Sequence, residues 1–400
     1  MAAPSPRIAA SLLLLVCSTA FNPEHSPAAA TVLNLRSFGA AGNGVADDGP
    51  ALQRALDALA AAGGGMLYVP PGRYAIATPV AKDFSGLASL VAITGETSRR
   101  VLRVKGSGSG LRLTSELTIQ VGRERVALTL GGLADLSIRD VAFVGVQDVR
   151  DDAQVVLLVR EIERAAVEHC EFYGLASLEP GGSIVAAHGS GLRVDQTAFL
   201  GCSTNSAHRA PVIQNLTWKD IAITNTKFVD YGNRPHFFSK TQLAPPYAWI
   251  SIGNAAAVQP DSSRREAVIR NVFLDEGSFI GIAARPDFHA PPSAPFDVFI
   301  SAIRMNVTNL AAWGIYLSGA RNVRIEKSHF GWSRNADAAI VLKGVEDAVL
   351  DRVECVAHAN TIRADAATRK LVVIDSVYET LDSAAPDTKV IRTPGALKRE

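Results

Sequence analysis

The chain has 400 residues, with 40 lysines and arginines against 39 aspartates and glutamates. This near-neutral balance excludes the basic electrostatic surface on which DNA- and RNA-binding proteins depend. Hydrophobic residues at 48% and charged residues at 20% are the proportions of a globular protein, so a disordered chain is excluded as well.

The first thirty residues have the pattern of a secretory signal peptide. Met1 to Arg7 carries one positive charge, and Ile8 to Ala20 is an apolar run that is too short to span a bilayer. Ala28-Ala29-Ala30 then supplies small residues at which cleavage can occur. We therefore expect a secreted or periplasmic protein with no integral membrane segment in its mature form.

Residues 38–74 carry the most specific motif of the chain. A Gly-rich turn and the acidic pair Asp47-Asp48 lead into a helix predicted over 48–62, which Gly63-Gly64-Gly65 ends. Either aspartate can cap this helix, because Asp is a favoured N-cap residue. A short strand and the turn Pro70-Pro71-Gly72 follow the helix.

This segment resembles the opening of the pectate lyase superfamily, in its rhamnogalacturonase- and epimerase-like group. The family pattern reads F-G-A-x-G-x-G-x-x-D-D, then a helix, then G-G-G-x-x-Y-x-P-P-G-x-Y. It is matched nearly completely from Phe38 to Tyr74. The resemblance implies a right-handed parallel β-helix whose first coil is covered by the helix, and a polysaccharide or oligosaccharide as the substrate.

A repeat extends over most of the remaining chain. Nine segments place two apolar residues in alternation, followed five positions later by a large apolar residue or its equivalent. These last residues are Phe143, Phe172, Phe199, Phe228, Leu274, Met305, Phe330, Cys355 and Tyr378, with steps of 29, 27, 29, 46, 31, 25, 25 and 23 residues. Such a period is typical of a solenoid whose stacked turns share one core.

The repeat predicts an all-β fold, a single-stranded right-handed parallel β-helix over residues 31–382, with a C-terminal tail at 383–400. The four phenylalanines from Phe143 to Phe228 should stack in one interior row. The cysteines fit this interpretation: Cys355 takes a core position, and the mature chain has an odd number of cysteines without a C-x-x-C pair, so neither a disulfide framework nor a metal site is predicted.

A second strand follows each copy after a loop, so these loops form a row on one side of the solenoid. The resemblance implies that in polygalacturonase-like members this loop row borders the substrate cleft. The step of 46 residues marks an inserted region at 229–266. Its loops and their neighbours supply our candidate catalytic residues, Asp230, His236, Lys240, Asp275 and Glu276, and our candidate substrate-binding residues, His208, Arg209, Tyr231, Arg234, Trp249 and Arg285. Lys343 is a further substrate-binding candidate, because it ends a later strand as the lysine of the polygalacturonase R-I-K motif does.

These residue types suit two reactions on a uronate-containing polysaccharide. Paired carboxylates such as Asp230 and Asp275 are what glycosidic hydrolysis requires. A lyase or C5-epimerase instead neutralises the uronate carboxylate with a cation and removes the neighbouring proton with a base, for which Arg234, His236 and Lys240 are suitable. Ca²⁺ is the cofactor expected if the protein is a lyase. The N-T-D motif of polygalacturonases is missing, so their active site does not transfer. A non-catalytic protein that binds glycans or forms a surface structure is the alternative.

We predict that export removes the apolar run, so that the mature protein begins between Ala20 and Thr31. Mass spectrometry of the N-terminus of the protein recovered outside the cytoplasm measures this directly. A cytoplasmic protein with Met1 intact is the result that contradicts the prediction.

Overall fold

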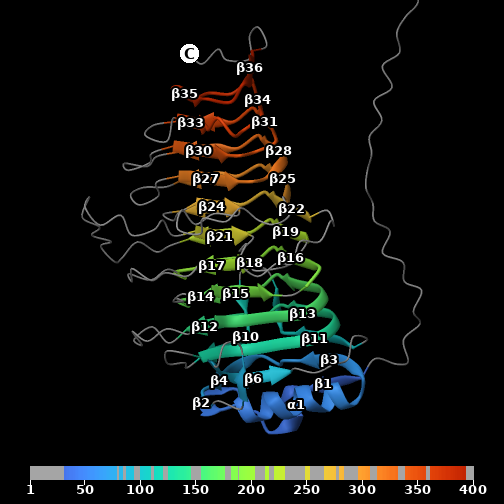
Figure 1. The fold of residues 1–400 in the computed structure, drawn as a ribbon. Coiled ribbons are helices and arrows are strands. Elements are labelled where there is room, and N and C mark those ends of the chain that lie inside the picture. Colours follow the sequence, from blue (N-terminus) through green and yellow to red (C-terminus); the bar gives the residue numbers. More distant parts are fainter. Residues whose placement is uncertain are drawn as a thin grey trace, which may run out of the picture. The chain divides into compact units, whose positions relative to one another are not determined.

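Each coil of the chain is built from three strands, and each strand pairs in parallel with the equivalent strand of the next coil (Figure 1). The structure is a computed structural model that describes residues 31–392, except for 79–80, 84–86, 94–99, 110–111, 120–124, 146–154, 176–181, 188, 203–211, 216–219, 230–247, 253–264, 276–278, 283–295, 307–312, 332–337 and 357–360. These described residues form one compact unit. The predicted fold class, a single-stranded right-handed parallel β-helix, is confirmed.

The first strands of the coils end at a tight corner. They are β1 (Val32–Asn34), β3 (Gly64–Tyr68), β7 (Val101–Lys105), the ends of β11 (Arg125–Arg139) and β13 (Val155–Glu168), β16 (Gly191–Asp195), β19 (Asp220–Thr224), β22 (Arg265–Arg270), β25 (Phe296–Ser301), β28 (Arg321–Glu326), β31 (Asp347–Asp351), β34 (Lys370–Ile374) and β36 (Asp387–Ile391). We call the outer surface of these strands the first face.

The second strands follow the corner and form a separate 11-stranded sheet. They are β2 (Asn43–Asp47), β4 (Gly72–Ile76), β10 (Ser115–Ile119), β12 (Ala142–Gly145), β14 (Glu171–Tyr173), β17 (Ala198–Leu200), β20 (Lys227–Val229), β23 (Phe273–Asp275), β26 (Arg304–Asn306), β29 (His329–Gly331) and β32 (Glu354–Cys355). Their outer surface is the second face.

The third strands complete the coils. They are β6 (Leu87–Ile93), the beginnings of β11 and β13, β15 (Gly182–Ala187), β18 (Ile213–Asn215), β21 (Ala248–Ile252), β24 (Phe279–Ile282), β27 (Trp313–Ser318), β30 (Ala338–Lys343), β33 (Thr361–Ala364) and β35 (Thr380–Ser383). Because β11 and β13 run through both rows, first and third strands share one 23-stranded sheet. The outer surface of the third strands is the third face.

The interior of the solenoid is a set of rows that run from coil to coil. Phe143, Phe172, Phe199 and Phe228 are fully buried, and their rings stack with centroid separations of 4.7, 4.8 and 4.8 Å. These separations equal the ordinary distance between paired strands, because each ring stands on a strand that pairs with the next. The predicted aromatic row is therefore confirmed, and Cys355 continues it beside Phe330, as predicted.

The corner between the first and second strands has a fixed backbone conformation. One residue per corner is left-handed, with φ values between 42° and 59° at Asp140, His169, Gln196, Asn225, Asn271, Ala302, Lys327, Arg352 and Asp375. The next residue points inward and is often small and polar. Thr197 is an example, since its hydroxyl donates to the carbonyl of Asp195 at 3.0 Å. The corner thus satisfies its own backbone carbonyl, which would otherwise be buried without a partner.

The helix α1 (Gly49–Ala61) covers the first coil, close to the helix predicted at 48–62 (Figure 1). Its stripe of Ala and Leu residues is buried as expected. The acidic pair acts differently from the prediction for Asp48, whose carboxylate accepts from the backbone N–H groups of Ala41 and Gly42 at 2.6 and 3.1 Å rather than capping the helix. Asp47 accepts from the N–H of Gly49 at 3.0 Å.

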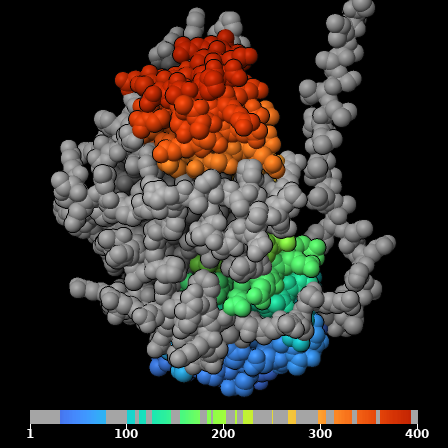
Figure 2. Space-filling model, in the orientation of Figure 1, coloured from blue at the N-terminus to red at the C-terminus, as the bar shows by residue number. Residues whose placement is uncertain are grey.

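Short elements complete the N-terminal part: the 3-10 helix η1 (Leu35–Phe38) and the strands β5 (Ala81–Asp83), β8 (Gly108–Ser109) and β9 (Arg112–Leu113). At the other end, β36 pairs with β34, so the solenoid extends into the stretch expected to be a tail. Figure 2 shows the N-terminal coils in blue and the C-terminal coils in red at opposite ends of this unit. No helix in the described ranges is long and apolar enough to cross a membrane.

We predict that Phe199→Ala lowers the free energy of unfolding by about 3–5 kcal/mol, because it leaves a cavity in the middle of the aromatic row. Phe299→Ala is the matched control, since Phe299 lies on the outer side of β25 and is only half-buried. Its cost should stay below about 1 kcal/mol. Equal losses in urea unfolding for the two variants would contradict the register.

Candidate functional site

The third face presents side chains whose direction follows from strand alternation. Ile315 and Leu317 of β27 are in the core, so Tyr316 lies on the outer side between them. In β30, Ile340 and Leu342 are likewise in the core, and Lys343 follows on the outer side as the last residue of the strand. The register aligns Leu317 with Leu342 and Ser318 with Lys343.

Lys343 and Tyr316 contact each other across neighbouring coils. The ammonium Nζ of Lys343 lies 5.4 Å from the centroid of the Tyr316 ring, within the range of a cation–π interaction. Tyr316 is 4% exposed, whereas Lys343 is exposed. The ammonium group therefore faces solvent while it lies over a buried aromatic ring. The ring therefore restrains a lysine that would otherwise sample many rotamers.

The strand end that carries Lys343 is fixed from the next coil. Gly344 turns the chain with φ 57°, and its N–H donates to Oδ1 of Asp365 at 2.9 Å. The same carboxylate accepts from the backbone N–H and the hydroxyl of Thr368, at 2.9 and 3.0 Å. Asp365 thus acts as a structural residue that holds the turn in place directly after Lys343.

A second cation follows on the same face. Arg363 of β33 pairs with Val341 in the strand register, and its Nε donates to Oδ2 of Asp382 in β35 at 3.1 Å. Four third strands, β27, β30, β33 and β35, form this part of the face. Among their described outward residues Asp382 is the one carboxylate, and it is paired with Arg363. The described outward side chains of these strands therefore include two cations and one carboxylate, and that carboxylate is paired.

Most of the predicted site residues lie outside the described residues. Lys343 is described completely, and the structure gives only the backbone of Trp249 in β21 and of Asp275 in β23. Asp275 pairs with Val229 in the register, which places it on the second face one coil after the residue that precedes Asp230. The others are outside the described ranges: Asp230, His236, Lys240, Glu276, His208, Arg209, Tyr231, Arg234 and Arg285.

Tyr316, Arg363 and Asp382 are site residues that the sequence prediction did not include. The step of 25 residues from Met305 to Phe330 relates Tyr316 to Val341, two positions before Lys343. The repeat therefore contained the signal for the Tyr316–Lys343 contact, because residues two apart on a strand point to the same face. The repeat steps do not relate Arg363 to Asp382, because these residues are 19 apart and the shortest step is 23.

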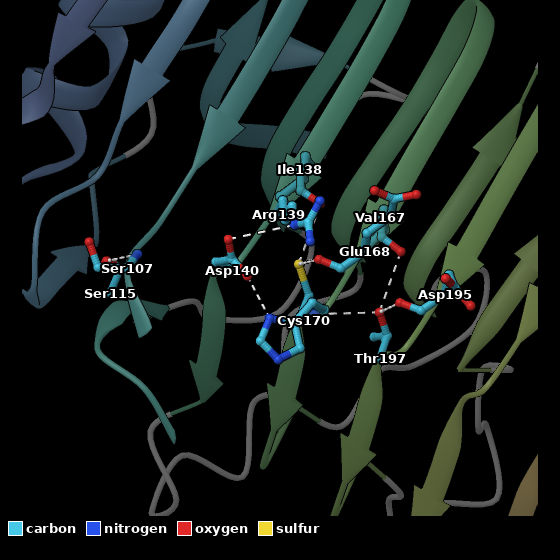
Figure 3. Close-up of polar contacts among 11 residues, drawn as sticks. Ser107, Ser115, Ile138, Arg139, Asp140, Val167, Glu168, Cys170, Asp195 and Thr197 are labelled. Atoms are coloured by element: carbon cyan, nitrogen blue, oxygen red, sulfur yellow. Dashed lines mark hydrogen bonds and ion pairs between the residues drawn. The ribbon is translucent and has the colours of Figure 1, made fainter. Parts of the chain in front are cut away.

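A second polar cluster lies at the corner between the first and second faces (Figure 3). Nδ1 of His169 lies 2.5 Å from Oδ1 of Asp140 in the preceding coil. Arg193 contacts Glu168 of the preceding coil at 3.6 Å and Asp195 at 3.1 Å. Each of these charges has a partner on its own or an adjacent coil, so the cluster acts as a ladder of structural contacts.

Asp195 illustrates how the ladder stabilises its charges. Burial raises the pKa of this carboxyl, but hydrogen bonds from Thr224, Asn225 and Arg193 outweigh that effect and hold the pKa below its ordinary value. The donors from Thr224 and Asn225, at 2.5 and 2.9 Å, come from the following coil. In the described part of the chain, no three His, Cys, Asp or Glu side chains are grouped to hold a metal ion.

Comparison with known proteins gives a family match over half of the chain. Residues 32–233 match the family described as rhamnogalacturonase A/epimerase, pectate lyase-like. Among curated proteins, the chain is 34% identical to mannuronan C5-epimerase AlgE1 of Azotobacter vinelandii over 110 residues, which are 27% of this chain and 8% of that protein. Over 43 residues it is 56% identical to AlgE6 of the same organism, covering 11% and 5%. The chain thus spans a small part of these relatives.

A solved structure supports the fold. PfbA, a surface adhesin of Streptococcus pneumoniae, superposes with a TM-score of 0.50 at 13% sequence identity, covering 90% of this chain and 92% of that chain. At this identity the similarity concerns the fold alone.

The corner cluster yields a prediction about pH. Burial raises the pKa of Glu171, the neighbouring His169 opposes this rise, and Glu116 adds to it. In the unfolded chain Glu171 ionises near the ordinary glutamate pKa of about 4.3, whereas in the native state it ionises at a higher pH. Between these two pKa values a rise in pH therefore lowers the free energy of unfolding. Glu171→Gln removes this loss. We expect this variant to have the free energy of unfolding of the parent protein at pH 4 and a value about 0.5 kcal/mol higher at pH 7. The difference is small because Glu171 is partly exposed.

Thermal unfolding of both proteins between pH 4 and pH 8 measures this difference. Glu163→Gln is the control, because Glu163 is exposed on β13 away from this cluster. A stability difference for Glu171→Gln that is constant over the whole range would refute the assignment.

Proposed function

The chain belongs to the rhamnogalacturonase A/epimerase, pectate lyase-like family, and from this premise we propose that it is an exported enzyme that acts on a uronate-containing polysaccharide at its third face. The observation that carries the proposal is the exposed ammonium of Lys343, held above the buried Tyr316 ring on the third face. We propose a polysaccharide as the substrate because of the family, and an acidic sugar because a cation binds its carboxylate.

The chemistry that we propose begins with removal of a carbon-bound proton. A base takes the proton from C5 of a uronate, and the electron pair moves into the carboxylate, which becomes an enolate with two negative oxygens. A fixed cation such as Lys343 stabilises this charge as it develops. If the electron pair of the enolate then forms the C4=C5 double bond, the glycosidic oxygen leaves C4 with the electrons of the broken C4–O bond and takes up a proton, and the reaction is a β-elimination. If C5 instead receives a proton on the opposite side, the reaction is a C5-epimerisation.

The curated relatives support this reaction type over hydrolysis. The matched proteins are mannuronan C5-epimerases, and epimerisation and elimination share the first step. On the described part of the third face, Asp382 is committed to Arg363, which leaves no free carboxylate pair there for hydrolysis. We propose that the base comes from the loop row, where Arg234, His236 and Lys240 are the candidates.

Three measurements on the same reaction mixture separate the possible activities. The protein is incubated in D₂O with alginate, polygalacturonate and rhamnogalacturonan, with and without EDTA. Ultraviolet absorbance of unsaturated uronate reports elimination, deuterium at C5 reports epimerisation, and reducing ends without absorbance report hydrolysis. Loss of elimination with EDTA would support Ca²⁺ as the cofactor of a lyase. Binding of these polymers without any of the three signals would favour the alternative, a non-catalytic glycan-binding protein.

We predict that Lys343→Ala lowers kcat/KM on the identified polymer at least tenfold, a loss of about 1.4 kcal/mol in transition-state stabilisation. Lys343→Arg should keep part of the activity, because it keeps the charge. Both variants should unfold within about 1 kcal/mol of the parent protein, since the side chain is exposed.

The control for this prediction is Lys389→Ala, which removes an exposed lysine from β36 on the first face. It should leave kcat/KM unchanged. If Lys343→Ala retains full activity while the parent protein turns over a uronate polymer, the cation that stabilises the charge lies elsewhere.

A further inference from the structure

The second face carries a column of outward residues, one from each coil. The strand register aligns Glu171 with Ala198, Ala198 with Lys227, Lys227 with Phe273, Phe273 with Arg304, Arg304 with His329 and His329 with Glu354. Neighbouring members are therefore one strand spacing apart, about 4.8 Å. We call the three central members, Lys227, Phe273 and Arg304, the second-face strip.

The cations of this strip differ from the arginines of the first face. Arg164, Arg193 and Arg321 each form an ion pair with a carboxylate on their own or an adjacent coil. Lys227 and Arg304 are exposed, and neither forms an ion pair with any side chain that the structure describes. Their positive charge is the feature of the strip that can attract an anion.

An aromatic ring lies between the two cations. Phe273 is half-buried, and Nζ of Lys227 lies 5.8 Å from the centroid of its ring. Arg304 stands one coil further along, so the two cations are about 10 Å apart with the ring between them. A half-exposed ring can stack on the apolar face of a sugar, and flanking cations can bind carboxylates on the neighbouring sugars.

Positions two residues further along the second strands form a neighbouring row. This row is apolar from Val144 through Tyr173 and Leu200 to Val229, with Tyr173 36% exposed. Beside Phe273 and Arg304 it continues with the polar positions Asp275 and Asn306. Both ends of the column are acidic. Glu171 is its first member and Glu354 its last, and Oε2 of Glu354 lies 2.9 Å from Nδ1 of His329. The positive stretch is therefore short, which suits a few sugars of an acidic chain better than a long duplex with dense phosphates.

We propose that the second-face strip is a binding site for an anionic polysaccharide, separate from the third face, in which Lys227 and Arg304 bind uronate carboxylates and Phe273 stacks on the sugar between them. The choice of a uronate as the ligand rests on the proposed function. The strip binds without reacting, and it holds a long polymer on the molecule while another segment of that polymer occupies the third face. Two linked contacts on one polymer raise its apparent affinity.

The test compares Lys227→Gln/Arg304→Gln with a double variant that removes two exposed charges from the first face, Arg324→Gln/Lys389→Gln. Binding of alginate and polygalacturonate is measured by isothermal titration calorimetry at low and high salt, with dextran as the neutral polymer. We expect the strip variant to bind the acidic polymers at least tenfold more weakly and to lose salt dependence, while the control binds like the parent protein. Phe273→Leu should weaken binding with less effect on the salt dependence.

Several outcomes would overturn the strip. These are no binding of acidic polymers by the parent protein, equal affinity in the strip variant and the control, or equal binding of dextran. Tighter binding of a DNA duplex, with the same loss in the strip variant, would also reject it, because phosphate would then be the ligand.

Turnover separates this proposal from the proposed function. If no uronate polymer is converted but the strip variant still loses binding, the proposed function fails and the strip stands. If polymers are converted and the strip variant binds them normally, the strip fails and the proposed function stands. Where both hold, the variant should raise KM for long polymers and leave short oligosaccharides unaffected.

Discussion

Parallel pairing between neighbouring coils is the constraint on which the rest of this structure depends. Each strand must meet the same strand of the next coil in register, so each position along a coil recurs at the same place one strand spacing further on. The stacked rings from Phe143 to Phe228 follow directly from this, since their centroid separations equal the spacing of the strands that carry them. Each interior residue therefore packs against the equivalent residues of the two neighbouring coils.

The same constraint fixes the corners and the outer faces. A coil that must return to its register needs a sharp corner at a constant place, and the left-handed residue with an inward hydroxyl or thiol after it supplies one. Charges on the outside fall into rows as well. Most first-face arginines form ion pairs with carboxylates of their own or adjacent coils, as Arg193 does with Glu168 and Asp195.

The functions that we propose lie where a cation of an outer row contacts an aromatic ring. On the third face, Lys343 lies over Tyr316, whereas Arg363 in the next coil is paired with Asp382. On the second face, Lys227 and Arg304 flank Phe273. Both places combine a cation with an aromatic ring across adjacent coils, a combination that is suited to acidic sugars.

The sequence by itself determined the interior rows from Phe143 onward and the helix over the first coil, because these depend on the periodicity of apolar residues along the chain. The repeat does not include the coils of β2, β4 and β10, which precede Phe143. It also pointed to Lys343. Only the tertiary structure decided that Asp48 holds the Gly-rich turn instead of capping the helix, and that Lys343 lies over Tyr316. It likewise decided which outer charges are paired. Many such partners come from adjacent coils, as Arg164 and Asp135 do at 29 residues apart and Arg363 and Asp382 do at 19, so the length of each connecting loop sets which side chains meet.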